Sequence, residues 1–265
     1  MKEIRLCDDT EANRILNLCV NNNFGIEIQG FYNPKLIGAE ETNELINKYR
    51  DILSNFKGGK SLHAPFWDLN LGTKNPMIKD VTMKTFNYAY EVAKVLGCTE
   101  IVVHNGFVPN TSFYDGWVRN ATSFWKEFFV DKDDSITMMI ENQCEEDSEV
   151  LKMQIDSVND PKLKICLDIG HAHANSNMGV EDWIKTLGDR IGYLHLHNNY
   201  GKLPGRPSYM NDEHLGLNMG TMDIAKVLEL LEEYCPNAIW NIECKLDYIK
   251  DSIEVLKELG YIESN

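Results

Sequence analysis

The chain has 265 residues, of which 43% are hydrophobic and 25% charged, a mixture typical of a globular protein with one large core. Its formal net charge of -15 opposes nonspecific binding to polyanions such as nucleic acid or an anionic membrane, although a local cationic patch or a bound metal can reverse the field near one site. No stretch approaches the roughly 20 apolar residues of a membrane helix, and the acidic start is unlike a signal peptide, so we expect a cytoplasmic protein that does not enter a membrane.

Short β-rich runs alternate along the chain with longer segments that have helical spacing. Eight runs are predicted to be strands: 3–7 (EIRLC), 24–30 (FGIEIQG), 61–66 (SLHAPF), 100–106 (EIVVHNG), 135–142 (SITMMIEN), 163–170 (LKICLDIG), 191–198 (IGYLHLHN) and 238–245 (AIWNIECK). The segments with helical spacing include 10–22, 39–56, 81–97, 148–158, 222–234 and 252–260. Gly97 and Gly260 end two of these segments, where a left-handed C-cap is expected.

This alternation predicts the fold class. Eight βα units in a chain of this length give roughly 33 residues per unit, which is typical of an α/β protein built as a single (β/α)8 TIM barrel. A doubly wound sheet is the alternative, but it usually needs fewer strands. No linker, low-complexity tract or charge block divides the sequence, so we expect one domain over residues 1–265.

The cysteines predict a reduced protein. Seven are dispersed along the chain without a Cys-x-x-Cys pair, and several lie in apolar runs. An odd number of scattered cysteines indicates free, mostly buried thiols and not a disulfide framework. They are Cys7, Cys19, Cys98, Cys144, Cys166, Cys235 and Cys244.

Polar residues gather where the predicted strands end, which in this fold is where the chemistry lies. One histidine or acid at a strand end is more often a packed residue or a helix cap. Six successive strands that share this feature are not explained in that way. Because imidazoles and carboxylates together are the ligands of zinc, manganese and related ions, the pattern predicts a divalent-metal site. The residues, in strand order, are His63, His104, Glu141, Asp168 (with His171 just beyond), His195 and Glu243.

A long polar segment at about 199–222 follows the seventh predicted strand. It carries Lys202, Arg206, Asp212 and His214. If this loop folds over the rim of the barrel, it brings Asp212 and His214 to the metal cluster.

Seven segments, taken in order, resemble the xylose isomerase-like TIM barrels. This superfamily holds sugar-phosphate isomerases and epimerases as well as enzymes of the endonuclease IV type. The resemblance extends over about 24–245, and the ordered set is specific although each short motif alone is weak. The segments are SLHAPF, EIVVHNG, MMIEN, CLDIGHAHA, YLHLHNN, NDEHLGLNMGTMD and WNIECK.

Resemblance to the isomerase and epimerase branch implies one divalent metal, held by Glu141, Asp168, His195 and Glu243. It also implies that Glu141 and Glu243 move a proton between neighbouring carbons of a sugar, through an enediolate held by the metal. The chemistry is reasonable, because the ion acidifies the C–H by polarising the adjacent oxygens, while a carboxylate on each face serves as base or acid.

Resemblance to the endonuclease IV branch implies three zinc ions, which generate hydroxide and hold phosphate oxygens. The triplet Asp212-Glu213-His214 discriminates between the branches, since a one-metal isomerase does not need it. The implied ligands are His63, His104 and Glu141 for the first ion, Glu141, Asp168, His195 and Glu243 for the second, and His171, Asp212 and His214 for the third.

The sequence departs from both branches. Tagatose-type epimerases carry an arginine soon after the histidine of strand seven, where the nearest cation here is Lys202. Endonucleases of this type read DNA with basic rim loops, whereas these loops contain few Lys and Arg. Phe66 and Trp67 stand where such enzymes wedge residues into DNA, but they fit an apolar lid over a small ligand equally well. A Gly-x-Gly motif usually precedes the last helix, and here Asn218 replaces its first glycine.

Other residues receive lesser roles. We assign His173 and His197 to packing or to support of the ligands, and Glu27 and Gln29 to the rim or to hydrogen bonds with a polyol. The candidate substrate-binding residues are Phe66, Trp67, Lys202, Arg206 and Lys245, of which the three cations could neutralise a phosphate or carboxylate.

These observations predict a sugar or sugar-phosphate isomerase/epimerase that requires one to three divalent ions, Zn or Mn, and takes a small molecule as its partner. The alternative is a multi-zinc phosphoesterase of the endonuclease IV type, for which a small phosphorylated substrate would agree with the acidic composition. A non-catalytic sugar-binding barrel is the third possibility. The sequence leaves the substrate, the metal and the oligomeric state open.

Overall fold

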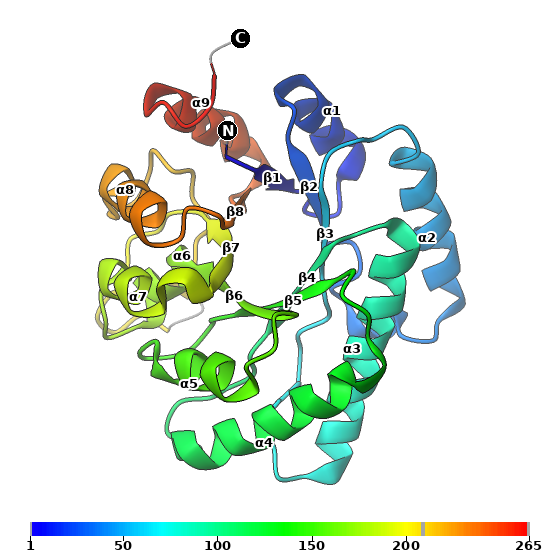
Figure 1. The fold of residues 1–265 in the computed structure, drawn as a ribbon. Coiled ribbons are helices and arrows are strands. Elements are labelled where there is room, and N and C mark those ends of the chain that lie inside the picture. Colours follow the sequence, from blue (N-terminus) through cyan, green and yellow to red (C-terminus); the bar gives the residue numbers. More distant parts are fainter. Residues whose placement is uncertain (1, 208–209, 264–265) are drawn as a thin grey trace.

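The computed structural model describes residues 2–207 and 210–263. Its eight strands form a closed parallel barrel in which each strand pairs with its neighbours in chain order and β8 closes on β1. Figure 1 shows the ring of strands with the helices outside it. The prediction of a single (β/α)8 TIM barrel is therefore confirmed. The predicted domain 1–265 and the loop at 199–222 include positions 1, 208–209 and 264–265, which lie outside the described residues, and the one-domain assignment stays a prediction.

The strands are β1 (Ile4–Cys7), β2 (Gly25–Ile28), β3 (Lys60–His63), β4 (Glu100–His104), β5 (Thr137–Glu141), β6 (Leu163–Asp168), β7 (Ile191–Leu196) and β8 (Ile239–Ile242). The α-helices are α1 (Ala12–Asn22), α2 (Glu40–Ile52), α3 (Pro76–Leu96), α4 (Tyr114–Phe128), α5 (Glu149–Val158), α6 (Ile169–Asn175), α7 (Val180–Leu187), α8 (Ile224–Tyr234) and α9 (Ile249–Glu258). Short 3-10 turns lie at η1 (Pro34–Leu36), η2 (Phe129–Asp131), η3 (Gly188–Arg190) and η5 (Leu246–Tyr248).

All eight predicted strands are present, but from the second onward they end earlier than expected. β3 ends at His63, short of the predicted residue 66, and Pro65 has no N–H with which to continue the ladder. β6 ends at Asp168 because the Asp168 carboxylate accepts a hydrogen bond of 2.6 Å from the backbone N–H of His171 and caps α6. Residues 169–170, predicted as strand, therefore form the first turn of a helix.

The helices differ from the expected segments mainly at their starts. α3 begins five residues before the predicted Val81, because Asn75 caps it by accepting a 3.0 Å hydrogen bond from Met77 N–H and Pro76 occupies the first helical position. α4, α6 and α7 come in addition to the segments named from the sequence. Gly97 and Gly260 have φ of 71° and 81°, which confirms the expected left-handed caps.

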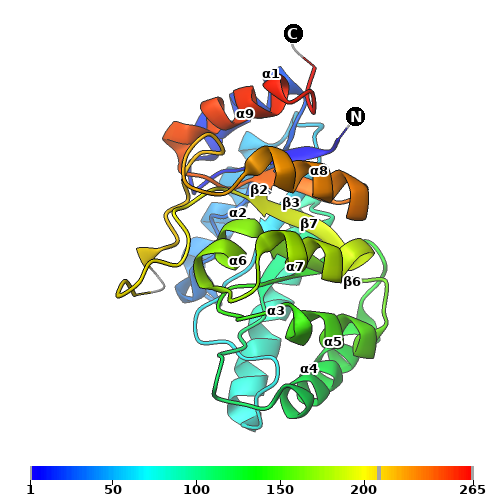
Figure 2. The same cartoon turned by 90° about the vertical axis from the view of Figure 1, so that its left-hand side faces the viewer.

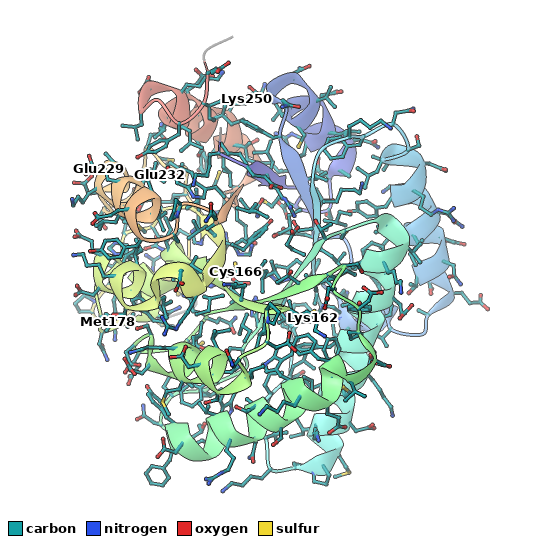
Figure 3. All side chains as sticks on the ribbon, in the orientation of Figure 1. Lys162, Cys166, Met178, Glu229, Glu232 and Lys250 are labelled. Atoms are coloured by element: carbon teal, nitrogen blue, oxygen red, sulfur yellow. The ribbon has the colours of Figure 1, made fainter. Side chains whose placement is uncertain are left out.

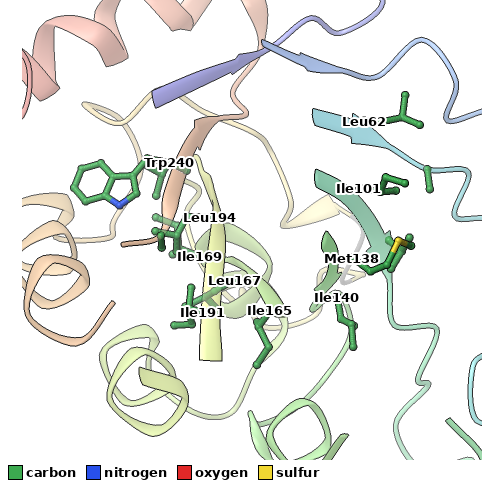
Figure 4. Packing of buried hydrophobic residues seen from close by; sticks show 14 of the residues in the cluster. Leu62, Ile101, Met138, Ile140, Ile165, Leu167, Ile169, Ile191, Leu194 and Trp240 are labelled. Atoms are coloured by element: carbon green, nitrogen blue, oxygen red, sulfur yellow. The ribbon is translucent and has the colours of Figure 1, made fainter. Parts of the chain in front are cut away.

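Strand alternation sorts the core into two layers. Side chains that point outward pack against the helices (Figure 4). A smaller cluster fills the interior of the barrel, where Figure 3 labels Cys166. The interior cluster consists of Val102, Met139, Cys166, Tyr193 and Ile239. Residues two positions further along these strands face the same interior, at its carboxyl end.

A buried arginine closes the amino end of the interior. The Arg5 guanidinium is 1% exposed, donates to Glu3 Oε1 at 2.8 Å and pairs with Glu100. It also lies 5.6 Å from the centre of the Tyr193 ring, and the Tyr193 hydroxyl hydrogen-bonds with Ser61 Oγ at 2.7 Å. The floor of the barrel is thus polar and connected by hydrogen bonds.

The cysteines and helices add two further facts. All seven cysteines are free thiols, and six of them are buried while Cys144 is exposed, in agreement with the expectation from the sequence. Among the helices of the described ranges, none combines the length and the apolar character needed to cross a membrane.

Candidate metal centre

The strand register gathers the predicted ligands at the carboxyl end of the barrel interior. His104 on β4 stands opposite Glu141 on β5, and Asp168 on β6 stands opposite His195 on β7. Each of these four residues lies two positions after an inward-facing residue of the interior cluster, so alternation alone directs it inward. Four neighbouring strands, β4 to β7, therefore deliver polar groups to one layer of the barrel.

The segment after β7 completes this layer. Asn198 and Leu215 form an antiparallel bridge with backbone hydrogen bonds of 3.0 and 2.9 Å, which ties the far end of the loop to β7. Figure 2 shows the segment between β7 and α8 extending beyond the strand ends. His214 adopts a φ of 48°, a left-handed conformation stabilised where its carbonyl accepts the N–H of Lys245 at 3.0 Å.

The first ligand group comprises His63, His104 and Glu141. Their side chains are buried, and the Nε2 atoms of His63 and His104 lie 3.2 and 3.3 Å from the same Glu141 oxygen. His63 Nδ1 donates to the Ala64 carbonyl at 3.0 Å. With that proton fixed, a neutral His63 directs the Nε2 lone pair toward Glu141, as a metal ligand would.

The second ligand group comprises Glu141, Asp168, His195 and Glu243. Its centre is His195 Nδ1, which lies 3.3 Å from Glu141, 3.7 Å from Asp168 and 2.9 Å from Glu243. Glu243 follows the last residue of β8, and its N–H donates to the Leu196 carbonyl at 3.1 Å, which continues the ladder. A nitrogen surrounded by three carboxylates is a donor set that suits a divalent cation.

The third ligand group comprises His171, Asp212 and His214. The Nε2 atoms of His171 and His214 both lie 3.1 Å from Oδ2 of Asp212. Their Nδ1 atoms donate to backbone carbonyls, His171 to Asn142 at 2.9 Å and His214 to Glu243 at 2.7 Å. The ligand atoms of these residues, together with one from His197, lie within 4.8 Å of one another.

Unpaired atoms test whether this donor set fits a metal. Within the described chain, His195 Nδ1 and Asp212 Oδ1 are buried and form no hydrogen bond. His195 Nδ1 lies close to Glu243 but lacks hydrogen-bond geometry toward it. Buried polar atoms without partners are costly, and coordination of a cation would satisfy both. The residues present therefore fit divalent metals.

The electrostatics of the metal-free cluster agree with this assignment. Burial raises the pKa of Glu141, but the charges of the neighbouring imidazoles, led by His104, outweigh burial and hold the pKa well below its usual range. Burial lowers the pKa of His171, but the Asp168 and other carboxylates raise it well above the usual value. Without metal, imidazole protons balance the carboxylates, and a divalent ion must displace them.

Residues beyond the ligand groups hold the ligands in place. Glu27 on β2 accepts a hydrogen bond of 3.1 Å from His195 Nε2. Gln29 donates to Glu243 Oε1 at 2.6 Å and to Glu27 at 3.1 Å. The Asn142 amide both donates to the Asp168 carbonyl at 2.9 Å and accepts the Asp168 N–H at 2.8 Å. The sequence placed Glu27 at a strand end, but Asn142 gave no signal except its position after Glu141.

A cavity of about 400 Å3 opens onto all three ligand groups. Phe66 forms part of its wall and stacks on His104 with ring centres 4.4 Å apart. Tyr32 lies 6.1 Å from Phe66 and also lines the cavity. Trp67, 5.8 Å from Tyr32, is half exposed at the edge of this aromatic cluster. The mouth of the cavity is therefore apolar on one side, and its volume suits a small molecule.

The predicted substrate-binding cations lie elsewhere on the rim. Lys202 and Arg206 line a separate hollow of about 540 Å3 beside Cys144. Lys202 donates to Asn177 at 2.7 Å and Arg206 pairs with Glu213 at 2.8 Å. Lys245 lines a third hollow of about 250 Å3 that includes Glu243. The structure thus brings the nine predicted metal ligands together but keeps Lys202 and Arg206 apart from them.

Comparisons of the sequence find one family model and several related proteins. The model described as "Xylose isomerase-like TIM barrel" matches residues 25–259. The uncharacterized protein MJ1311 of Methanocaldococcus jannaschii is 31% identical over 219 residues, which cover 76% of this chain and 69% of that protein. A probable endonuclease 4 of Thermoplasma acidophilum is 27% identical over 176 residues, which cover 61% of this chain and 58% of that protein.

Comparisons of the structure show the same fold. A D-tagatose 3-epimerase-like protein superimposes with a TM-score of 0.75 at 24% identity, covering 97% of this chain and 96% of that chain. The TTHB071 protein from Thermus thermophilus, from a crystal soaked with ZnCl2, superimposes with a TM-score of 0.74 at 20% identity, covering 99% of both chains.

Proposed function

The chain belongs to the xylose isomerase-like TIM barrels, and we propose that it is a divalent-metal-dependent isomerase or epimerase of a sugar or sugar phosphate. The observation that carries this proposal is the pair Glu141 and Glu243. Both side chains are buried, both approach His195 Nδ1, and both line the small cavity. Two carboxylates at the ends of different strands can address one substrate from two sides.

Several residues of the chain have separate roles in the proposed reaction. A bound divalent ion supplies Lewis acidity to the substrate oxygens. Burial raises the pKa of Glu243, but the charge of His195 outweighs it and lowers the pKa, so Glu243 starts as a carboxylate able to accept a proton. Gln29 orients that carboxylate through its 2.6 Å hydrogen bond. Glu141 is the partner that handles the proton at the neighbouring carbon, and Phe66 and Tyr32 limit the access of water.

Deuterium exchange tests the reaction. The protein is loaded with Mn2+, Co2+ or Zn2+, and ketoses and ketose phosphates are incubated with it in D2O and followed by proton NMR. We expect metal-dependent loss of one substrate C–H signal, with the rate reduced about 10²- to 10⁴-fold in Glu243→Gln and Glu141→Gln. Glu44→Gln removes an exposed carboxylate on α2, away from these groups, and should exchange at the wild-type rate. Exchange that persists in Glu243→Gln would contradict the proposal.

A specific observation favours a second candidate, a multi-zinc phosphoesterase. The third ligand group lies against the second, with His171 Nδ1 3.2 Å from Glu141 and 3.4 Å from Asp168, so up to three ions could share one cavity. A probable endonuclease 4 is also among the relatives. The charge of -15 weighs against a DNA substrate.

Metal content and hydrolysis separate the two candidates. Three zinc ions per chain, with zinc-dependent cleavage of bis-p-nitrophenyl phosphate or of DNA with an abasic site, would favour the phosphoesterase. One ion per chain, with C–H exchange and no hydrolysis, would favour the isomerase. Stabilisation by sugars without either reaction would indicate a binding protein.

A further inference from the structure

His197 is a buried histidine beside the ligand groups to which the proposed reaction gives no role. Its side chain is fully buried. Its Nε2 lies 3.1 Å from Oδ1 and 3.2 Å from Oδ2 of Asp168, but 3.8 Å from Asp212. A ring nitrogen equidistant from both oxygens of one carboxylate has the geometry of an N–H donor to that carboxylate.

The other ring nitrogen supports this assignment. In the described chain, His197 Nδ1 is buried without a hydrogen-bond partner. If Nε2 bound a metal, Nδ1 would carry the proton and would be a buried N–H donor without an acceptor, which is more costly than an unused lone pair. The ligand-group histidines His63, His171, His195 and His214 each place that second nitrogen against an acceptor, and only His104 does not.

The hydrogen bond from His197 sets the orientation of the Asp168 carboxylate. Oδ1 of Asp168 accepts the backbone N–H of His171 at 2.6 Å as well as His197 Nε2. Oδ2 also accepts from His197 Nε2, at 3.2 Å, and it lies beside the second ligand group, 3.7 Å from His195 Nδ1. His197 therefore contacts both oxygens of the Asp168 carboxylate and holds it with Oδ2 beside the ligand cluster.

His197 also contacts the third ligand group. Its ring is stacked on the His214 ring with centres 4.0 Å apart and planes 10° apart. On the side of Gly170 the ring is tightly enclosed, because a Cβ at Gly170 would lie 1.9 Å from His197 Cε1. The ring is thus closely packed at Gly170 and contacts both Asp168 and His214.

We propose that His197 is a positioning residue that couples the second and third ligand groups, by hydrogen bonding to Asp168 and stacking on His214. The proposal rests on the metal-dependent function above. Metal at one group orders the ring that supports the other, so the two sites bind metal with positive cooperativity. His197 itself is not a ligand.

Cobalt binding by the metal-free full-length protein tests the hydrogen bond. Co2+ affinity is measured by competition with a chromophoric chelator, and coordination is followed in the visible spectrum. We expect His197→Phe to weaken binding about 10- to 100-fold at the second group, whereas His197→Gln, which keeps an N–H donor near the position of Nε2, retains most of the affinity. His173→Phe changes a rim histidine outside the ligand groups and serves as the matched control.

A mutant cycle tests the coupling. Asp212→Asn disables the third group, and it should weaken Co2+ binding at the second group in the wild-type background but not in the His197→Phe background. Equal weakening in both backgrounds would overturn the coupling. Loss of one bound Co2+ in both His197→Phe and His197→Gln, with the remaining affinity unchanged, would show that His197 is a ligand and would also overturn it.

Two measurements keep the result interpretable. Melting of the metal-free variants shows whether each one folds, and Gly170→Ala displaces the ring without altering its chemistry if His197→Phe does not fold. Gly170→Ala should weaken both sites, and unchanged affinity would count against the proposal. A wild-type protein that binds no Co2+ would refute the proposed function, whereas metal binding that is indifferent to His197 would refute only the coupling.

Discussion

Glu27 Oε2 accepts a hydrogen bond of 3.1 Å from Nε2 of His195, although 168 positions separate the two residues in the sequence. Both side chains are fully buried. The contact fixes the proton of a neutral His195 on Nε2 and leaves the Nδ1 lone pair facing Glu141, Asp168 and Glu243. Carboxylate support of this kind sets both the tautomer and the orientation of a metal-binding histidine.

Removing this support should weaken metal binding. We expect Glu27→Leu to lower the affinity for Zn2+ about 10- to 100-fold, because His195 can then rotate and lose its tautomer. Glu27→Gln keeps an acceptor oxygen and should lose less Zn2+ affinity than Glu27→Leu. Chelator competition measures the affinity, with Glu44→Gln, an exposed carboxylate on α2, as the control. Equal affinities in all four proteins would refute the role of Glu27.

Metal affinity should rise with pH because the third group must release protons. Burial lowers the pKa of His214, but the hydrogen bond and charge of Asp212 outweigh it and raise the pKa to about 9 in the metal-free protein. Above that pH the imidazole is neutral and free to bind, so the apparent affinity should increase up to tenfold per pH unit from pH 7 to 9 for each displaced proton. In Asp212→Asn the pH dependence should be shallower. Zinc titrations at three pH values check this.

The raised pKa of His214 also makes the stability of the metal-free protein depend on pH. The folded pKa of His214 lies above its ordinary value of 6.5, so its ionised contact with Asp212 contributes full stability below about pH 6.5. That contribution is lost as the pH rises through about 9. Urea unfolding of the metal-free protein from pH 6 to 10 should show a decline that is smaller in His214→Phe. A decline of equal size in both proteins would contradict a contribution of the His214–Asp212 contact to stability.

Asp8 should destabilise the protein at neutral pH. Burial raises its pKa from 3.8 to about 6, despite hydrogen bonds from Tyr49 and from the Gln29 and Thr10 backbone N–H groups. The folded state therefore holds the proton more tightly than the unfolded state, and stability falls as the pH rises from about 4 through 6. Two pKa units correspond to about 3 kcal/mol. Asp8→Asn should lack this fall in urea unfolding, whereas the exposed Asp51→Asn should retain it.

The arginine at the floor of the barrel should be essential to stability. Arg5→Met leaves Glu100 without its buried partner and removes the cation from the Tyr193 ring. A loss of about 3–5 kcal/mol is expected from urea unfolding. Because the cost lies mainly in the unpaired carboxylate, the double variant Arg5→Met/Glu100→Gln should recover part of it. No recovery would mean that lost packing dominates.

The local pattern of the sequence determined the barrel and the identity of its strand-end residues. Alternation with period two is a property of each strand alone, so placing His104 two residues after Val102 already directs it inward. The exact ends of the strands and the caps of the helices were harder to predict from the sequence, because each depends on a hydrogen bond made by a single side chain. Asp168 shows this, since its carboxylate ends β6 and begins α6 while one oxygen faces His195.

Tertiary structure alone decided which atoms meet. Which nitrogen of His195 faces the carboxylates depends on Glu27, and the role of His197 depends on both Asp168 and His214. The bridge between Asn198 and Leu215 places Asp212 beside His171, while Lys202 of the same loop faces a different hollow. These outcomes depend on contacts between residues far apart in the chain, whose directions no local periodicity encodes.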